Sequence, residues 1–295
     1  MKQTNPVGRG KQTWKQLQEI ARFGYSSSDI FSDFVDICLS ALLSLTDNMQ
    51  YADITERLSE NKLTGTYEDR YMHLVEKYKE NKSRKPGERP MDFFTNAWSQ
   101  LQSETQESQE DILGDLYESQ ISLGEHGQFF TPSSITTMMV QMLGGTDGER
   151  VSDPACGSGR FFISMAKTNV DLHFYGIDVS PICARMTALN MWLFNLNADI
   201  YQGNSLSMEM SCLWRIRKGG FIWETKPDPS KVTRIVEERP ATMAEISPVQ
   251  AQLPVEMPPP TPPARAKKSG KKQQPSTAVQ QALFDFSEEK MVDSE

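Results

Sequence analysis

The sequence predicts an α/β fold, with an open parallel sheet in the middle of the chain, helices before it and a disordered tail after it. Between residues 131 and 206, short apolar runs alternate with amphipathic stretches, which is the rhythm of a βαβαβ unit. Before residue 122 the apolar residues recur at helical spacing. After about residue 240, proline and lysine replace most apolar residues, which is typical of a solvated segment.

Residues 1–112 are expected to form a helical region. Phe31, Phe34, Val35 and Cys38 fall on one face of a helix, and similar spacing marks the stretches from 66 to 81 and from 92 to 106. The spacing of these segments predicts several helices that pack their apolar faces against one another.

Residues 113–239 are expected to form the α/β domain. Its predicted elements are a helix from 133, a strand at 150–152, a helix at 161–168, a strand at 172–178, a helix at 180–195 and a strand at 199–204. Residues 219–225 predict a fourth strand, or an edge hairpin without a functional role. The sheet is expected to be truncated, so its open edge needs a cover.

Composition and charge narrow the class of protein. The 295 residues carry a formal net charge of −8, so contact with DNA would require a local basic patch or a partner subunit. The four cysteines are scattered and have no metal-ligand spacing, which indicates a reduced protein without disulfides and without a metal site. The longest apolar stretch, at 35–45, is too short and too polar to span a bilayer. We expect a soluble cytoplasmic protein with no membrane partner.

The run Asp153-Pro154-Ala155-Cys156-Gly157-Ser158-Gly159 predicts a ligand loop between a strand and a helix. Two glycines allow a sharp turn and a close approach of a ligand to the backbone. A dinucleotide fingerprint would carry a third glycine where Arg160 to Phe162 stand here. The turn therefore suits a cofactor without phosphate better than a dinucleotide.

Two further positions extend this candidate site. Asp178 ends the next strand, 25 residues after Asp153, where a carboxylate can accept both hydroxyls of a ribose. The alternative is that Asp178 only caps the following helix. Thr131 is expected to cap a helix whose first residue is Pro132, leaving free N–H groups that favour a carboxylate.

Four strings together resemble one family: GQFFTP at 127–132, DPACGSG at 153–159, YGIDVSP at 175–181 and YQGNSL at 201–206. They are similar to the motifs of adenine-N6 DNA methyltransferases of the type I restriction-modification class, over residues 113–207. The resemblance implies a Rossmann-like methyltransferase sheet, S-adenosylmethionine as cofactor and DNA as partner.

The resemblance also implies roles for seven residues. If the family's roles apply to the matching positions, Thr131 and Asp153 hold the methionine end of the cofactor, and Asp178 holds its ribose. Asn204 meets the adenine ring. The loop itself is lined by Ala155, Gly157 and Gly159.

The same family carries out its chemistry with an Asn/Asp-Pro-Pro-Tyr/Phe segment, which accepts the N–H bonds of a flipped adenine and stacks on it. These 295 residues contain no such tetrapeptide; the nearest strings are at 228–230 and 257–260. No catalytic residue is therefore assigned. We expect that the catalytic strand has been lost or that a second subunit supplies it. The alternative is a non-catalytic scaffold or sensor. A methyltransferase for proteins or small molecules is disfavoured by GQFFTP.

The tail contains Gln280-x-x-Leu283-Phe284, which resembles the peptide that docks bacterial proteins on the sliding clamp. A flexible tether before two adjacent apolar anchors gives such a peptide its reach. The alternative is a short terminal helix that packs Leu283 and Phe284 on the body of the protein.

Overall fold

The computed structural model describes residues 9–50, 66–79, 84–122, 130–144, 147–168 and 171–227. All of them belong to one unit, Met1–Pro229. The predicted tail at 240–295, with Gln280, Leu283 and Phe284, lies outside the described residues, and so do the strings at 228–230 and 257–260. The domain boundary expected at 112/113 stays a prediction.

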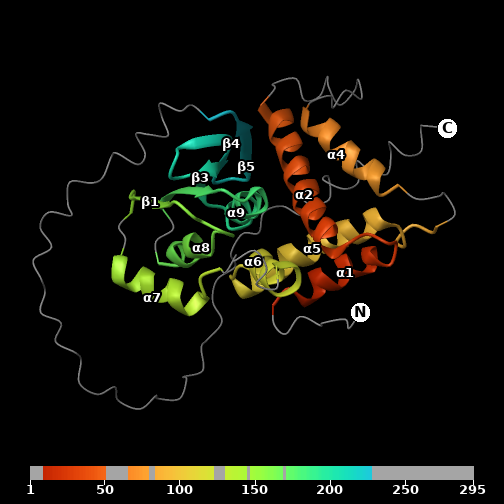
Figure 1. Ribbon diagram of the computed structural model, residues 1–295, viewed down its shortest axis with the longest axis horizontal. Coiled ribbons are helices and arrows are strands. Elements are labelled where there is room, and N and C mark those ends of the chain that lie inside the picture. The colour runs from red at the N-terminus through yellow and green to blue at the C-terminus, as the bar shows by residue number, and fades with distance from the viewer. Residues whose placement is uncertain are drawn as a thin grey trace, which may run out of the picture. The chain divides into compact units, whose positions relative to one another are not determined.

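The N-terminal region is helical, as the spacing of its apolar residues predicts. Its elements are α1 (Lys11–Ala21), α2 (Ser27–Gln50), α4 (Thr66–Lys77), α5 (Pro90–Ser108), α6 (Ile112–Leu116) and the π-helix η1 (Tyr117–Ser122). Helix α1 packs against α5, and α2 packs against α4 (Figure 1). Aromatic rings fill the core between them: Phe94 stacks on Phe34 with centroids 6.3 Å apart and meets Tyr78 edge-on at 4.8 Å.

A five-stranded mixed sheet follows, with α7 (Ser133–Leu143) before it. In chain order its elements are β1 (Arg150–Asp153), α8 (Arg160–Ala166), β2 (His173–Asp178), α9 (Pro181–Leu193), β3 (Asn197–Asn204), β4 (Glu209–Arg217) and β5 (Phe221–Thr225). The strand order is β1-β2-β3-β4-β5; β1, β2 and β3 are parallel, whereas β4 and β5 are antiparallel to their neighbours. The predicted Rossmann-like α/β unit is confirmed.

Strand β4 is absent from the sequence prediction, although its signal is present. Met210, Cys212, Trp214 and Ile216 alternate with other residues at the period of a strand. The segment predicted as a fourth strand is β5, which forms a hairpin with β4 through Gly219 and Gly220 at φ +97° and +89°. The chain therefore turns back on itself after β3 instead of crossing to the far side of β1.

The helical region supports the sheet at its β5 edge. Helix α2 contacts both α9 and β5. At this edge the backbone N–H of Ile222 donates to Thr46 Oγ1 at 3.2 Å, and the carbonyl of Glu224 accepts from the Tyr67 hydroxyl at 3.1 Å. The β5 edge is thus closed by side chains of α2 and α4. None of the helices in the described ranges is long and apolar enough to cross a membrane.

Candidate cofactor site

The loop after β1 has the sharp turn that its glycines predict. Asp153 ends β1, and its Oδ1 accepts the N–H of Ala155 at 3.0 Å. Gly157 and Gly159 have φ values of +58° and +83°, and Gly159 is the N-cap of α8. A Cβ on Gly157 would lie 3.0 Å from the Phe130 ring, so a side chain there meets backbone strain and a tight contact with that ring.

Asp178 joins this loop to the loop after β2. Its Oδ2 accepts the N–H of Gly157 at 2.8 Å, and its Oδ1 accepts the N–H of Ser180 at 2.8 Å. The N-cap of α9 is Ser180, so Asp178 lies before the helix and outside its first turn. Each carboxylate oxygen keeps a second lone pair, which leaves Asp178 able to accept further hydrogen bonds from a ligand.

Burial raises the pKa of both carboxyl groups at this site. For Asp178 the loss of solvent outweighs the two backbone hydrogen bonds, and the nearby Asp153 charge raises its pKa further. Burial also raises the pKa of Asp153. Two half-buried acids near each other favour a ligand that brings hydrogen-bond donors or a positive charge.

Asn204 ends β3, one strand beyond Asp178. Its Oδ1 accepts the N–H groups of Leu206 at 2.8 Å and Ser207 at 3.3 Å, which fixes the turn into β4. Asp153, Asp178 and Asn204 therefore stand at the carboxyl ends of three neighbouring parallel strands, where open α/β sheets bind ligands.

The N-cap position of α7 lies one residue after Thr131, the residue that was predicted to hold it. Helix α7 begins at Ser133, and its cap position is Pro132, which has an extended ψ of 145° and no side-chain cap. A proline with an extended ψ cannot be the first helical residue, so the expected cap by Thr131 is wrong. Instead, the Thr131 carbonyl accepts a hydrogen bond from Arg160 Nη1 at 3.3 Å, and Thr131 itself is exposed.

A buried polar network, which the sequence did not predict, holds the loop from the side of the helical region. Asp111, 2% exposed, accepts four hydrogen bonds. Its Oδ2 accepts from the Ser158 hydroxyl and from Arg160 Nε at 3.2 Å, and its Oδ1 accepts from Gly114 N–H and Asn190 Nδ2, both at 2.8 Å. Because Ser158 stands between the two loop glycines, this carboxylate fixes the loop to α6 and α9.

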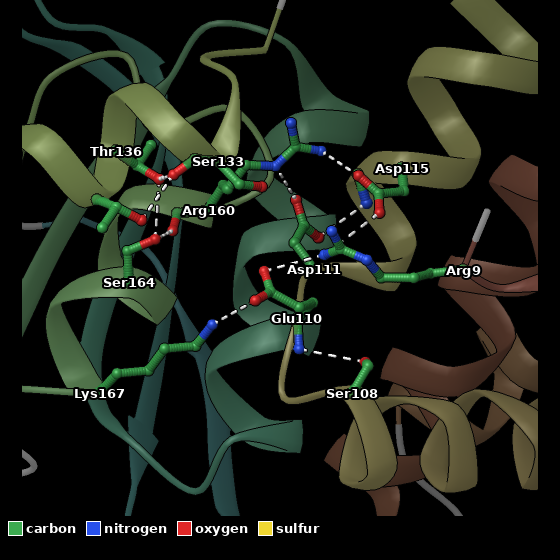
Figure 2. Close-up of polar contacts among 12 residues, drawn as sticks. Arg9, Ser108, Glu110, Asp111, Asp115, Ser133, Thr136, Arg160, Ser164 and Lys167 are labelled. Atoms are coloured by element: carbon green, nitrogen blue, oxygen red, sulfur yellow. Dashed lines mark hydrogen bonds and ion pairs between the residues drawn. The ribbon is translucent and has the colours of Figure 1, made fainter. Parts of the chain in front are cut away.

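Arg160 completes the network at the start of α8. Figure 2 shows its guanidinium between Asp111 and Asp115; the Asp115 contact is 2.8 Å, and a third carboxylate, Glu118, lies at 3.4 Å. Burial alone would lower the pKa of Arg160, but the three carboxylates raise it, so the guanidinium stays charged. Two features of the sequence could have pointed to this network: an arginine directly after the glycine loop, and an aspartate, Asp111, at the N-cap of α6.

No cluster of metal-ligating residues occurs in the part of the chain that the structure describes. Cys156 lies inside the loop, but burial raises the pKa of its thiol well above the ordinary value. The site is thus built from carboxylate acceptors, backbone N–H donors and glycines, a combination that suits an organic cofactor with hydroxyl and amine groups.

A family model described as N-6 DNA Methylase matches residues 108–218. Residues 108–218 are thus similar to the N-6 DNA methylase family. The match includes Asp111 and Arg160 as well as the loop and all three strand ends. It confirms the resemblance drawn from the four motifs.

Curated proteins that are similar to this part of the chain are methylase subunits of type I restriction enzymes. The HindI subunit of Haemophilus influenzae is 34% identical over 110 residues, which are 32% of this chain and 24% of that protein. The MjaIX subunit of Methanocaldococcus jannaschii is 29% identical over 121 residues, covering 37% and 22%. The MjaVII subunit is 26% identical over 194 residues, covering 60% and 29%. The chain thus spans less than a third of the length of these relatives.

Two solved structures are similar in part. One is the type I restriction-modification methyltransferase subunit of Streptococcus thermophilus, with a TM-score of 0.35 and 14% identity over 63% of this chain and 56% of that one. The other is a putative class I S-adenosylmethionine-dependent methyltransferase of Listeria monocytogenes, with a TM-score of 0.31 and 15% identity over 65% and 54%.

Proposed function

We propose that this chain binds S-adenosylmethionine at the loop Asp153–Gly159 and forms the cofactor-binding part of an adenine-N6 DNA methyltransferase. The observation that carries the proposal is the convergence of Asp153, Asp178 and Asn204 at three neighbouring strand ends around a two-glycine loop. The family match over the same residues supports it. When bound, S-adenosylmethionine supplies the methyl group for transfer.

The residues present fit this cofactor in their chemistry. Asp178 has acceptor capacity left for the two ribose hydroxyls, because each oxygen receives one backbone N–H. Asp153 offers a carboxylate to the methionine ammonium group. The backbone at Ala155, Gly157 and Gly159 lets the cofactor approach the main chain. Asn204 keeps its Nδ2 donor for the adenine, since its Oδ1 serves the turn.

Catalysis by the complete methyltransferase requires more than this cofactor part. The 295 residues lack an Asn/Asp-Pro-Pro-aromatic segment, and their net charge of −8 opposes DNA binding by the average field. We infer that a second subunit supplies the adenine-holding segment and most of the DNA contact. The alternative is a non-catalytic sensor that binds the cofactor without methyl transfer. Labelled S-adenosylmethionine with unmethylated DNA, with and without the second subunit, separates the two.

The tail motif supports a second, independent proposal. Gln280, Leu283 and Phe284 have the spacing of a clamp-binding peptide behind a proline- and lysine-rich tether. Docking on a bacterial sliding clamp would bring the chain to newly replicated DNA, without any change at the cofactor site.

Calorimetric titration with S-adenosylmethionine tests the main proposal. Saturable binding that weakens in Asp178→Asn supports the site as described. The absence of any heat of binding at millimolar cofactor, with the protein folded, contradicts it.

A further inference from the structure

The two edges of the sheet differ in how they are closed. The β5 edge is covered by Thr46 and Tyr67 of the helical region. The β1 edge has no neighbouring strand among the described residues. The N–H of His173 donates to the carbonyl of Glu149 at 3.0 Å, and backbone groups alternate between the two edges of a strand. Ser152, which is exposed, therefore directs its N–H and C=O toward the open edge.

Helix α7 carries an apolar stripe on its solvent-exposed face. The structure has eight exposed large apolar side chains in its described part, and five of them lie on α7: Ile135, Met138, Met139, Met142 and Leu143. Four of these follow the spacing i, i+3, i+4, i+7 of one helical face. The residues that α7 buries are instead Thr136 and Val140. An apolar stripe of this kind marks an interaction surface.

The stripe and the open edge belong to the same part of the fold. Helix α7 packs against α8, the helix that directly follows β1 and the cofactor loop (Figure 1). In open α/β sheets a ligand lies in the crevice outside the strand ends, at the point where the strand order reverses. Here the order runs in one direction from β1 to β3, so β1 forms one wall of the crevice and the described chain supplies no second wall.

We propose that the β1 edge and the α7 stripe form a docking surface for a second, different polypeptide, which adds a strand parallel to β1. This rests on the proposed function, because the added strand would bring its carboxyl end beside Asp153 and so deliver the missing adenine-holding segment. Its apolar side chains would cover the α7 stripe. The site is incomplete without that wall.

Two other occupants fit the surface less well. The described chain leaves the sheet at β5, the opposite edge, and ten of the chain's 17 prolines lie between residues 229 and 275, where they cannot donate to a strand ladder and restrict pairing to proline-free stretches such as 230–239 and 276–295. A two-fold-related second copy would pair its own β1 antiparallel, which turns the amino end of the added strand toward the cofactor loop. A strand that is added parallel to β1 instead turns its carboxyl end toward the cofactor loop.

Photo-crosslinking in the cells that encode the protein identifies the occupant. A benzophenone amino acid replaces Met142, which is 78% exposed, and in a control it replaces Met72 of α4, which is 39% exposed. We expect a crosslink from position 142, and none from position 72, to a single different polypeptide. A crosslink to residues 228–295, a crosslink to a second copy, or no crosslink above the control overturns the proposal.

The captured chain is then purified and titrated against full-length variants. Met138→Asp with Met142→Asp should weaken the complex at least about tenfold, because apolar anchors at the centre of an interface carry most of its affinity. Ser152→Pro should do the same, since it removes an edge amide while an edge strand tolerates proline. Met72→Asp should leave the complex unchanged. Unaltered affinity in both test variants contradicts the docking surface.

Cofactor titration of the same proteins keeps the two proposals apart. The α7 variant, Met138→Asp with Met142→Asp, should bind S-adenosylmethionine within about twofold of the unaltered chain, as it leaves the loop contacts in place. A chain that forms the complex but never binds cofactor refutes the proposed function alone. A chain that binds cofactor but shows no docking refutes this inference alone.

Discussion

Replacing Asp111 with Asn is expected to destabilise the protein by about 3 kcal/mol and to weaken cofactor binding, although it changes almost no volume. The Asp111 carboxylate accepts from Ser158 and Arg160 on one oxygen and from Gly114 and Asn190 on the other. An Asn side chain offers one acceptor oxygen and one NH₂ group. Either pair of donors would therefore face another donor in a buried site.

The magnitude follows from the burial of the ion pair. The side chains of Asp111 and Arg160 are 1% and 8% exposed, so solvent screens their interaction little. Breaking a buried pair typically costs about 3–5 kcal/mol. The lower end applies here because Arg160 keeps Asp115 and Glu118 as partners. For a unit of this size the change corresponds to a fall in Tm of roughly 6–12 °C.

The affinity for the cofactor should fall in the same variant. Loss of the Ser158 anchor frees the middle of the loop, and one lost hydrogen bond of about 1 kcal/mol weakens the cofactor Kd roughly fivefold. Urea denaturation and calorimetry measure the two effects at a temperature where the variant is folded. Asp171→Asn is the matched control, since Asp171 is 62% exposed in its ion pair with Lys218, and it should shift stability by less than about 0.5 kcal/mol. A loss below about 1 kcal/mol in Asp111→Asn, with unchanged Kd, would refute the reasoning.

Three other outcomes are expected. First, burial raises the pKa of Asp178 and Asp153 in the free chain, whereas ribose hydroxyls and an ammonium group favour the ionised forms, so cofactor binding should release protons and weaken as the pH falls through the raised pKa values. Calorimetry in buffers of different ionisation heat measures this, and a Kd that stays flat from about pH 7 to pH 4.5 contradicts it. Second, the isolated chain should show little or no adenine methylation of DNA, because loss of transition-state hydrogen bonds costs on the order of a hundredfold or more in rate; robust turnover with labelled cofactor would prove this wrong. Third, a labelled peptide of residues 276–290 should bind a bacterial sliding clamp at around micromolar Kd, and Leu283→Ala with Phe284→Ala should abolish it; no saturable binding, with a lower Tm of the double variant, would favour helix packing instead.

The sequence predicted the parallel half of the sheet because its signals are local. Glycines and acids at strand ends mark the turn after β1 and the end of β2, and apolar runs mark the strands themselves. The same local signals assigned the N-cap of α7 to Thr131, one residue before the observed cap position at Pro132. Helix limits depend on the ψ angle of the boundary residue, which composition does not reveal.

What the sequence could not predict depends on contacts between distant residues. Asp111 looks like an ordinary helix cap, yet its partner Arg160 is 49 residues away and Asn190 is 79 residues away. Strand β4 alternates as a strand should, but alternation alone does not specify its antiparallel return beside β3, which includes a bulge at Gln202/Gly203 where a Cβ on Gly203 would lie 2.3 Å from the Glu209 carbonyl. The open edge of β1 is a consequence of that return.

The most direct test of the central claim is a calorimetric titration of the full-length chain with S-adenosylmethionine, alongside Asp178→Asn and the surface control Asp171→Asn. The account predicts one saturable site, weakened about tenfold to a hundredfold in Asp178→Asn through the loss of one or two charge-assisted hydrogen bonds, and unchanged in the control. The absence of binding by the folded chain at millimolar cofactor, or equal affinity in all three proteins, would contradict the account.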